Sequence, residues 1–211
     1  MKKNIIFILR IVSEIVFLFL FFFFSFTGKT QLWLLFMMVS FVSSIFLGRI
    51  FCGFICPIET LFRPLNWIYN KLGIKRLNVP KIFKHSFWRY LILVIFVASI
   101  IIFRVMKIKV NLFIVALISA MIITLFFKEV FWHRYLCPYG ALFSILSRKS
   151  IFRMKITQSN CAGCGLCSNV CPTEAIEKNP SSKYEIEQRE CILCMECIKK
   201  CPKSTINYTK K

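Results

Sequence analysis

Long apolar stretches alternate with short polar segments over the first two thirds of the chain. Four stretches are almost unbroken runs of aliphatic and phenylalanine residues, and they cover approximately Ile5–Phe26, Leu32–Phe51, Trp88–Met106 and Leu112–Phe127. Each approaches the ~20 residues that an α-helix needs to cross ~30 Å of hydrocarbon. The pattern therefore predicts a mainly α-helical membrane protein with four transmembrane helices, arranged as two hairpins.

The first of these stretches is the only one that carries charges away from its ends. Arg10 and Glu14 lie four residues apart, so they can neutralise each other on one face of a helix. The Met1-Lys2-Lys3 start is compatible with a signal peptide, but the run is long, Glu14 interrupts it, and no small-residue cleavage site follows. We expect a retained membrane anchor with a structural ion pair.

The C-terminal segment Thr157–Lys211 has a different composition, since it is polar, poor in aromatic residues and internally repeated. Cys171-Pro172 and Ile176 in the first copy match Cys201-Pro202 and Ile206 in the second. A segment this short cannot bury a self-sufficient core, so bound metal is expected to support its fold. The predicted organisation is a four-helix transmembrane domain over 1–156 and a small α+β domain over 157–211. Short strands are expected at Tyr184–Ile186 and around Ile176 and Ile206.

The membrane half also contains a duplication. Arg49–Phe62 (RIFCGFICPIETLF) resembles Val130–Phe143 (VFWHRYLCPYGALF), and each follows a pair of predicted spans. Each is continued by an amphipathic basic segment, Leu61–Leu72 or Leu142–Ile156. These segments suit helices that lie along an anionic inner leaflet.

Net charge is strongly positive, at +20, but its distribution does not indicate nucleic-acid binding. The predicted outer loops hold few basic residues, whereas the N-terminus, the central loop and the segment after the fourth span are rich in them. The outer set is Lys29, Arg104, Lys107 and Lys109. This bias predicts a cell-membrane protein whose N-terminus, central loop and C-terminal domain are cytoplasmic. Every cysteine then lies in a reducing compartment and is available as a ligand.

Eight of the eleven cysteines form two C-x2-C-x2-C-x3-C-P runs. This spacing is typical of bacterial ferredoxins with two [4Fe–4S] clusters, in which the fourth cysteine of each run ligates the other cluster. Paired zinc sites, the alternative, usually have longer gaps between C-x2-C units. The predicted ligand sets are Cys161, Cys164, Cys167 and Cys201 for one cluster, and Cys191, Cys194, Cys197 and Cys171 for the other.

The other three cysteines belong to the duplicated elements. Cys52 and Cys56 are four residues apart, as are His133 and Cys137, and on an α-helix such pairs share a face. If the two halves pack about a pseudo-twofold axis, the four residues could form a site for iron, zinc or copper. A reversible Cys52–Cys56 dithiol and residues that only pack are the alternatives. Glu59, at the membrane boundary, is either a proton acceptor for quinol or an ordinary interfacial carboxylate.

The combination of four spans, C-x3-C-P elements and a two-cluster C-terminal segment resembles the NapH/MauN group of membrane ferredoxins. It is also similar to the C-terminal part of NosR and to the CcoG proteins. The resemblance implies membrane-bound electron transfer, often between the quinone pool and a partner reductase or a maturation step. His133 departs from the family pattern, which usually has a cysteine at that position.

The sequence therefore predicts an iron–sulfur electron-transfer component of an oxidoreductase system. It would pass electrons between the quinone pool, or another membrane donor, and a partner oxidoreductase. The basic face should attract an acidic redox protein or a partner reductase subunit. Alternatively, this charge only anchors the protein to anionic lipid. The alternative is an assembly or maturation factor that reduces a metal ion or target cofactor at Cys52, Cys56, His133 and Cys137. A transporter is less favoured, because the spans lack further paired ionisable residues.

Overall fold

The computed structural model describes residues 2–107 and 110–210 of the chain. Lys109 of the predicted outer loop lies outside these ranges. The chain forms two compact units, of which one combines Met1–Cys56 with Phe143–Lys211 and the other is Pro57–Leu142. The helix α7 (Pro138–Ser147) contributes its start to the second unit and its end to the first.

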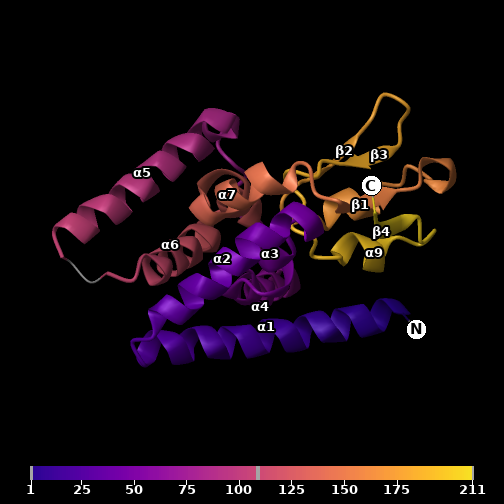
Figure 1. The fold of residues 1–211 in the computed structure, drawn as a ribbon. Coiled ribbons are helices and arrows are strands. Elements are labelled where there is room, and N and C mark those ends of the chain that lie inside the picture. Colours follow the sequence, from indigo (N-terminus) through magenta and orange to yellow (C-terminus); the bar gives the residue numbers. More distant parts are fainter. Residues whose placement is uncertain (1, 108–109, 211) are drawn as a thin grey trace. The chain divides into compact units, whose positions relative to one another are not determined.

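The first unit joins the N-terminal helices to the whole polar C-terminal region (Figure 1). Its further elements are α1 (Lys2–Phe26), α2 (Thr30–Leu47), α3 (Ile50–Phe54), β1 (Phe152–Ile156), η3 (Gln158–Asn160), α8 (Leu166–Asn169), β2 (Ile176–Lys178), β3 (Tyr184–Ile186), α9 (Glu196–Lys200) and β4 (Ile206–Lys210).

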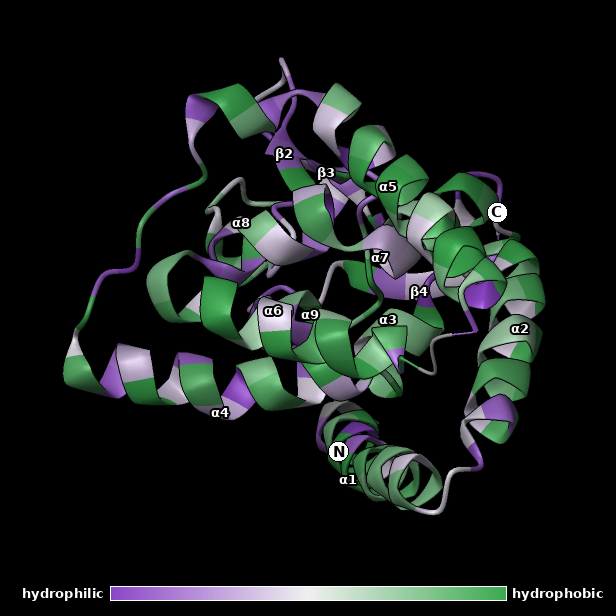
Figure 2. Ribbon diagram, turned by 90° about the vertical axis from the view of Figure 1, so that its left-hand side faces the viewer, coloured by the Kyte–Doolittle hydropathy of each residue, from purple (hydrophilic) through white to green (hydrophobic). Residues whose placement is uncertain are grey.

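The second unit contains the remaining helices. They are α4 (Pro57–Leu72), the 3-10 helix η1 (Lys81–Lys84), α5 (Ser86–Val105), α6 (Leu112–Phe126) and the π-helix η2 (Phe131–Leu136). The helix predicted over Leu61–Leu72 is confirmed as part of α4, which alternates hydrophobic and hydrophilic residues along its length (Figure 2). A parallel bridge between Leu77 and Phe127 ties the segment after α4 to the end of α6.

The helices that could span a membrane coincide with the apolar stretches predicted from the sequence. Within the described residues, three helices are long and apolar enough to cross a membrane, namely Asn4–Phe26, Thr30–Leu47 and Phe87–Val105. The fourth apolar helix, α6, has 15 residues. The protein is thus a mainly helical membrane protein with apolar helices in two hairpins and a small α+β region, as predicted.

One predicted span ends earlier than its apolar pattern. The stretch expected to continue to Phe51 stops at Leu47, because Gly48 adopts a left-handed φ of 73° and its N–H caps Ser44 O at 3.0 Å. Glycine adopts this left-handed conformation at little energetic cost because it has no Cβ. Gly48 therefore ends the helix and allows the chain to turn into α3.

The small sheets hold together the C-terminal region. β1 pairs antiparallel with β4, and β2 pairs antiparallel with β3, so the predicted strands are confirmed. Their buried side chains form a core with cysteines of both runs, comprising Met154, Cys167, Ile176, Ile186, Leu193, Cys197 and Ile206. The prediction of a continuous amphipathic helix over Leu142–Ile156 is wrong, because α7 ends at Ser147 and the segment turns into β1.

Candidate metal centres

Two pockets in the C-terminal region are each lined by four cysteines. The second cysteine pocket, as we name it, is lined by Cys171, Cys191, Cys194 and Cys197. Apart from Thr173, its other lining residues are apolar, and Met154, Ile176, Ile186 and Leu193 are among them. The first cysteine pocket is lined by Cys161, Cys164, Cys167 and Cys201, together with Ile156, Tyr184 and Pro202. In both pockets the last cysteine of one run meets the first three cysteines of the other.

The donor chemistry of these pockets fits an iron–sulfur cluster. Each offers four soft sulfur ligands from separate points of the backbone, and the described cysteines form no disulfide. Ala175 N donates to Cys171 Sγ at 3.3 Å, and the Thr205 hydroxyl lies 3.4 Å from Cys201 Sγ. Such contacts stabilise a thiolate ligand and help to set the potential of a bound cluster.

Burial raises the pKa of thiols in both pockets, including that of Cys167 in the first. It raises the pKa of Cys191 to about 12, and it also raises the pKa of Cys197. Burial alone would raise the pKa of Cys201 too, but hydrogen bonds from Thr205 and from the backbone of Lys203 and Ser204 lower it. A thiol must lose its proton to ligate metal, so a bound cation is needed most in the second cysteine pocket.

The two ligand loops share a backbone conformation but differ in side chains. Gly163 and Gly165 in the first run have left-handed φ values of 65° and 76°, and the matching Leu193 and Met195 have 57° and 61°. A left-handed conformation costs roughly 1–2 kcal/mol for a residue with a side chain. Leu193 is buried, and a Cβ added to Gly48 would lie 3.1 Å from its Cδ1. The second run therefore uses a larger side chain to pack against the end of α2.

Arg10 of α1 binds the second ligand loop directly. Its side chain is only 1% exposed, and its Nε contacts Glu14 Oε1 and Gly53 O, both at 2.8 Å. One terminal nitrogen donates to Cys194 O at 2.5 Å and to Glu196 Oε1 at 2.9 Å. The predicted Arg10–Glu14 pair is thus confirmed, and the same guanidinium also joins α1, α3 and the cysteine loop.

Two further contacts fix the C-terminal region on the N-terminal helices. A Cβ on Gly53 would lie 2.3 Å from Ile192 O and 3.0 Å from Cys194 N, so only glycine allows this approach. Arg49, also 1% exposed, donates to Arg189 O at 2.9 Å. This contact of Arg49 was not predicted from the sequence. The C-x3-C-P element therefore touches the loop that carries Cys191 and Cys194.

Both Cys-Pro elements depart from the α-helical geometry expected of them. Cys56 N bonds to Phe51 O at 2.9 Å, and Cys137 N bonds to Trp132 O at 2.8 Å, each a bond between residues five apart. α3 ends at Phe54, before Cys56, and His133 lies in a π-helix that ends before Cys137. The assumption that each pair shares one α-helical face is wrong, although the local hydrogen bond repeats. The predicted set Cys52, Cys56, His133 and Cys137 draws on both units and stays a prediction.

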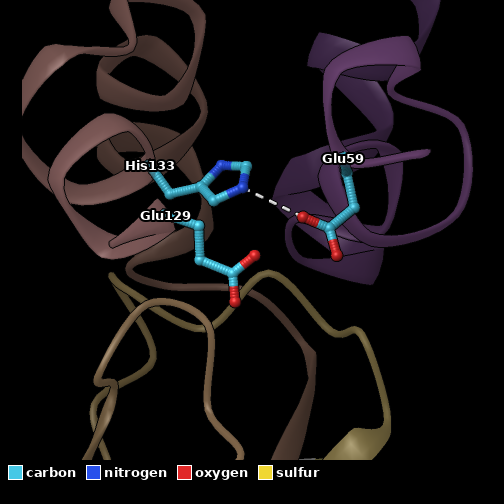
Figure 3. Close-up of side chains that lie close together, drawn as sticks. All are labelled: Glu59, Glu129 and His133. Atoms are coloured by element: carbon cyan, nitrogen blue, oxygen red, sulfur yellow. Dashed lines mark ion pairs between the residues drawn. The ribbon is translucent and has the colours of Figure 1, made fainter. Parts of the chain in front are cut away.

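Inside the second unit, His133 belongs to another group of ligand-type side chains. His133 Nε2 lies 2.9 Å from Glu59 Oε2, and donor atoms of Glu59, Glu129 and His133 all fall within 4.8 Å of one another (Figure 3). Glu59 and His133 are 3% and 6% exposed. Burial, followed by the charge of Glu59, raises the pKa of Glu129 to about 7. We call these three residues the Glu–Glu–His group.

Sequence reasoning missed several of these residues. It did not single out Glu129, Asn66 or Arg76, although Asn66 Nδ2 donates to Glu129 Oε2 and Arg76 donates to Asn66 Oδ1. Glu129 was nevertheless visible as a carboxylate four residues before His133 in a chain with few acidic residues. Gly53, between Cys52 and Cys56, gave no signal of the close contact that requires it.

Comparisons with known proteins agree with this architecture. The family described as "4Fe-4S binding domain" matches residues 30–75, and the family described as "4Fe-4S dicluster domain" matches residues 135–175 and 160–205. No solved structure was found that matches the chain. An apolar helical anchor with a dicluster region defines a membrane-bound ferredoxin-type protein, and this chain has iron–sulfur binding domains of that class.

Individual relatives narrow the class to a family. The chain is 30% identical to the uncharacterized protein MJ0749 of Methanocaldococcus jannaschii, over 82% of this chain and 69% of the relative. It is 29% identical to the putative electron transport protein YccM of Escherichia coli, over 83% of this chain and 55% of the relative. It is 25% identical to the ferredoxin-type protein NapH of Haemophilus influenzae, over 78% and 63%. The chain belongs to the NapH/MauN-type family of membrane ferredoxins, to which NosR is related.

Proposed function

We propose that this chain passes electrons between the quinone pool, or another membrane donor, and a partner oxidoreductase. The observation that carries the proposal is the convergence of eight cysteines into two four-cysteine pockets beside an apolar helical anchor. The printed names of YccM and NapH, an electron transport protein and a ferredoxin-type protein, support the same role. In functional terms the chain divides into a membrane domain, 1–156, and a ferredoxin domain, 157–211.

The ligand assignment follows the pockets. Cys161, Cys164, Cys167 and Cys201 hold one [4Fe–4S] cluster, and Cys191, Cys194, Cys197 and Cys171 hold the other. Bound clusters supply one-electron transfer at both positions. The protein holds the thiolates in place, donates hydrogen bonds to sulfur, and excludes water from the second cysteine pocket with buried Ile176, Ile186 and Leu193.

The environment of the two pockets suggests their order. The second cysteine pocket faces α1 and α3 through Arg10 and Gly53, whereas Cys164 of the first is exposed. A membrane donor therefore exchanges electrons at the second pocket and a water-soluble partner at the first. The buried guanidinium of Arg10 beside Cys194 favours the more negative, reduced state there.

The same contacts support a proposal for the orientation of the chain in the membrane. Arg10, near the start of α1, binds Cys194 and Glu196, so the N-terminal end of α1 and the ferredoxin domain lie on one side of the bilayer. The basic segments favour the cytoplasm for that side and for the central loop, in a multi-pass cell-membrane protein. The net charge of +20 then favours an acidic redox protein or an acidic reductase subunit as partner.

A second function is favoured by the repeated Cys-Pro elements. Both carry the same hydrogen bond between residues five apart, and π-type geometry of this kind is frequent at functional sites. The match to a 4Fe–4S binding family over residues 30–75 includes Cys52 and Cys56. In this alternative the chain is an assembly or maturation factor that reduces a metal ion or cofactor at Cys52, Cys56, His133 and Cys137.

The experiment that tests the main proposal uses the full chain, purified without oxygen and placed in lipid nanodiscs. Addition of a menaquinol analogue should bleach the visible iron–sulfur absorbance and produce the electron paramagnetic resonance (EPR) signals of reduced clusters. A dithionite-treated sample serves as the fully reduced reference. Clusters that dithionite reduces but no quinol reduces would exclude the quinone pool as donor. Activity of a Cys52→Ala variant in metal-ion reduction, with cluster content intact, would exclude the maturation site.

A further inference from the structure

The Glu–Glu–His group lies in the unit Pro57–Leu142 and has no part in the electron-transfer proposal. Glu59 is in the first turn of α4, Glu129 follows α6, and His133 is in the π-helix η2. Two segments that are far apart in the sequence, α4 and the helical segment 129–136, therefore bring one imidazole and two carboxylates to one point (Figure 3). A buried point of this composition needs a physical reason, because charged groups are rarely buried unless they are paired or bind metal.

Apolar packing holds the imidazole in place. The ring of Phe62, which is fully buried, packs edge-on against His133 with ring centroids 5.1 Å apart. His133 Nε2 lies 2.9 Å from Glu59 Oε2 but has no hydrogen-bond partner among the described residues, because the two atoms do not meet hydrogen-bond geometry. The two atoms thus approach closely, and they form an ion pair when the imidazole is protonated (Figure 3).

A second layer of polar groups orients the other carboxylate. Asn66 Nδ2 donates to Glu129 Oε2, and Arg76 donates to Asn66 Oδ1 and to Thr124 O, the latter at 3.2 Å. The Arg76 guanidinium also lies over the ring of Tyr69, 4.9 Å from its centroid. Carboxylates that ligate metals are commonly fixed by such outer hydrogen bonds.

We propose that Glu59, Glu129 and His133 bind one divalent first-row transition-metal ion, of the class Mn²⁺, Fe²⁺ or Zn²⁺. Imidazole nitrogen and carboxylate oxygen are ligands that these ions accept, and three protein donors leave positions for water or substrate. Bonds of about 2.1 Å place neighbouring ligands of an octahedral ion about 3.0 Å apart, close to the observed spacing of His133 and Glu59. The positive ion also relieves the repulsion between the buried carboxylate of Glu59 and the half-buried carboxylate of Glu129.

The test uses the full chain with its iron–sulfur clusters intact, freed of loosely bound metal by chelation. Mn²⁺ is the probe, since its EPR signal distinguishes bound from free ion and the clusters contain none. The wild type should bind one Mn²⁺ per chain. Glu59→Gln and Glu129→Gln should weaken binding at least about ten-fold, and Asn66→Ala by about ten-fold. The matched control is Glu185→Gln, which removes an exposed carboxylate on β3. This variant should bind Mn²⁺ as the wild type does.

A second measurement protects the test against variants that fail to fold. X-ray absorption of Zn²⁺ bound to the wild type should show nitrogen and oxygen ligands and no sulfur. The proposal is overturned if the wild type binds Mn²⁺ no more tightly than Glu129→Gln does. It is also overturned if the ligands of the bound zinc include sulfur. The visible absorbance of the iron–sulfur clusters reports on the electron-transfer proposal separately, so either proposal can fail while the other stands.

Discussion

The substitution Gly53→Ala has two opposing effects on stability, because alanine favours the helix but its Cβ would clash with a neighbouring backbone. Gly53 lies in the short helix α3, where alanine is intrinsically more favourable than glycine by about 1 kcal/mol. The added Cβ, however, would lie 2.3 Å from Ile192 O and 3.0 Å from Cys194 N. These are backbone atoms of the second ligand loop, so they cannot rotate away. We therefore expect the contact to dominate and the substitution to destabilise docking of the loop.

The size of the effect follows from this geometry. Overpacking of a tight site typically costs about 1–3 kcal/mol. The cost stays within this range because the ligand loop can move away from α3 and remove the clash. A change of this size corresponds to an about 5- to 150-fold higher population of the undocked state. Amide hydrogen exchange of the segment around Cys191–Cys197 should accelerate by that factor, while exchange in α5 stays unchanged.

Gly28→Ala is the control for this substitution. Gly28 has a positive φ of 71° and no atom within 4 Å of an added Cβ, so alanine there strains the turn between α1 and α2 without touching the ferredoxin domain. Exchange around Cys191–Cys197 should then match the wild type. Unchanged or slower exchange in Gly53→Ala would refute the claim that the C-x3-C-P element and the ligand loop are in contact.

The remaining predictions concern a buried charge, a cluster ligand and a helix cap. Arg10→Met leaves Glu14 buried without its cation and should cost about 3–5 kcal/mol in the same exchange experiment, whereas Arg10→Met/Glu14→Gln should cost less. Cys171→Ser should lower iron from about eight towards about four per chain, measured by iron analysis, with Thr173→Ser as a neighbouring control. Asn111→Ala removes the acceptor for Phe113 N and Ile114 N and should cost about 1 kcal/mol, seen as a lower Tm; the exposed Asn70→Ala should not lower it.

Local patterns were sufficient to predict the apolar helices and three of the strands, β2, β3 and β4. Continuous apolar runs predicted the spans, and Ile176, Tyr184–Ile186 and Ile206 predicted strands, because these signals depend on neighbouring residues alone. The strand Phe152–Ile156 was mistaken for part of a helix. Its partner is Ile206–Lys210, and the pairing that decides its conformation is remote in sequence.

The contacts between the ferredoxin domain and the N-terminal helices could not be predicted from local sequence patterns. Arg10 and Glu14 were recognised as an ion pair, but the carbonyls of Gly53 and Cys194 that Arg10 also binds carry no signal in the sequence. One trace was present: the glycines at 163 and 165 are replaced by Leu193 and Met195 in the second run. Large side chains at left-handed positions indicate a loop that is packed against something.

The site of His133 was predicted only in part. Its ligand character was recognised, but the partners were sought at helical spacing, among the cysteines. The structure places it in a π-helix beside Glu59 and Glu129. A single π-type turn redirects the following side chains, and hydrophobic periodicity does not report it.

Iron and sulfide analysis of the full chain, purified without oxygen and combined with EPR of the dithionite-reduced protein, tests the central claim most directly. Two cubanes held by the two cysteine pockets predict about eight iron and about eight sulfide per chain, with signals of two clusters close enough to interact. A colourless, folded protein that contains zinc in place of iron would contradict the account.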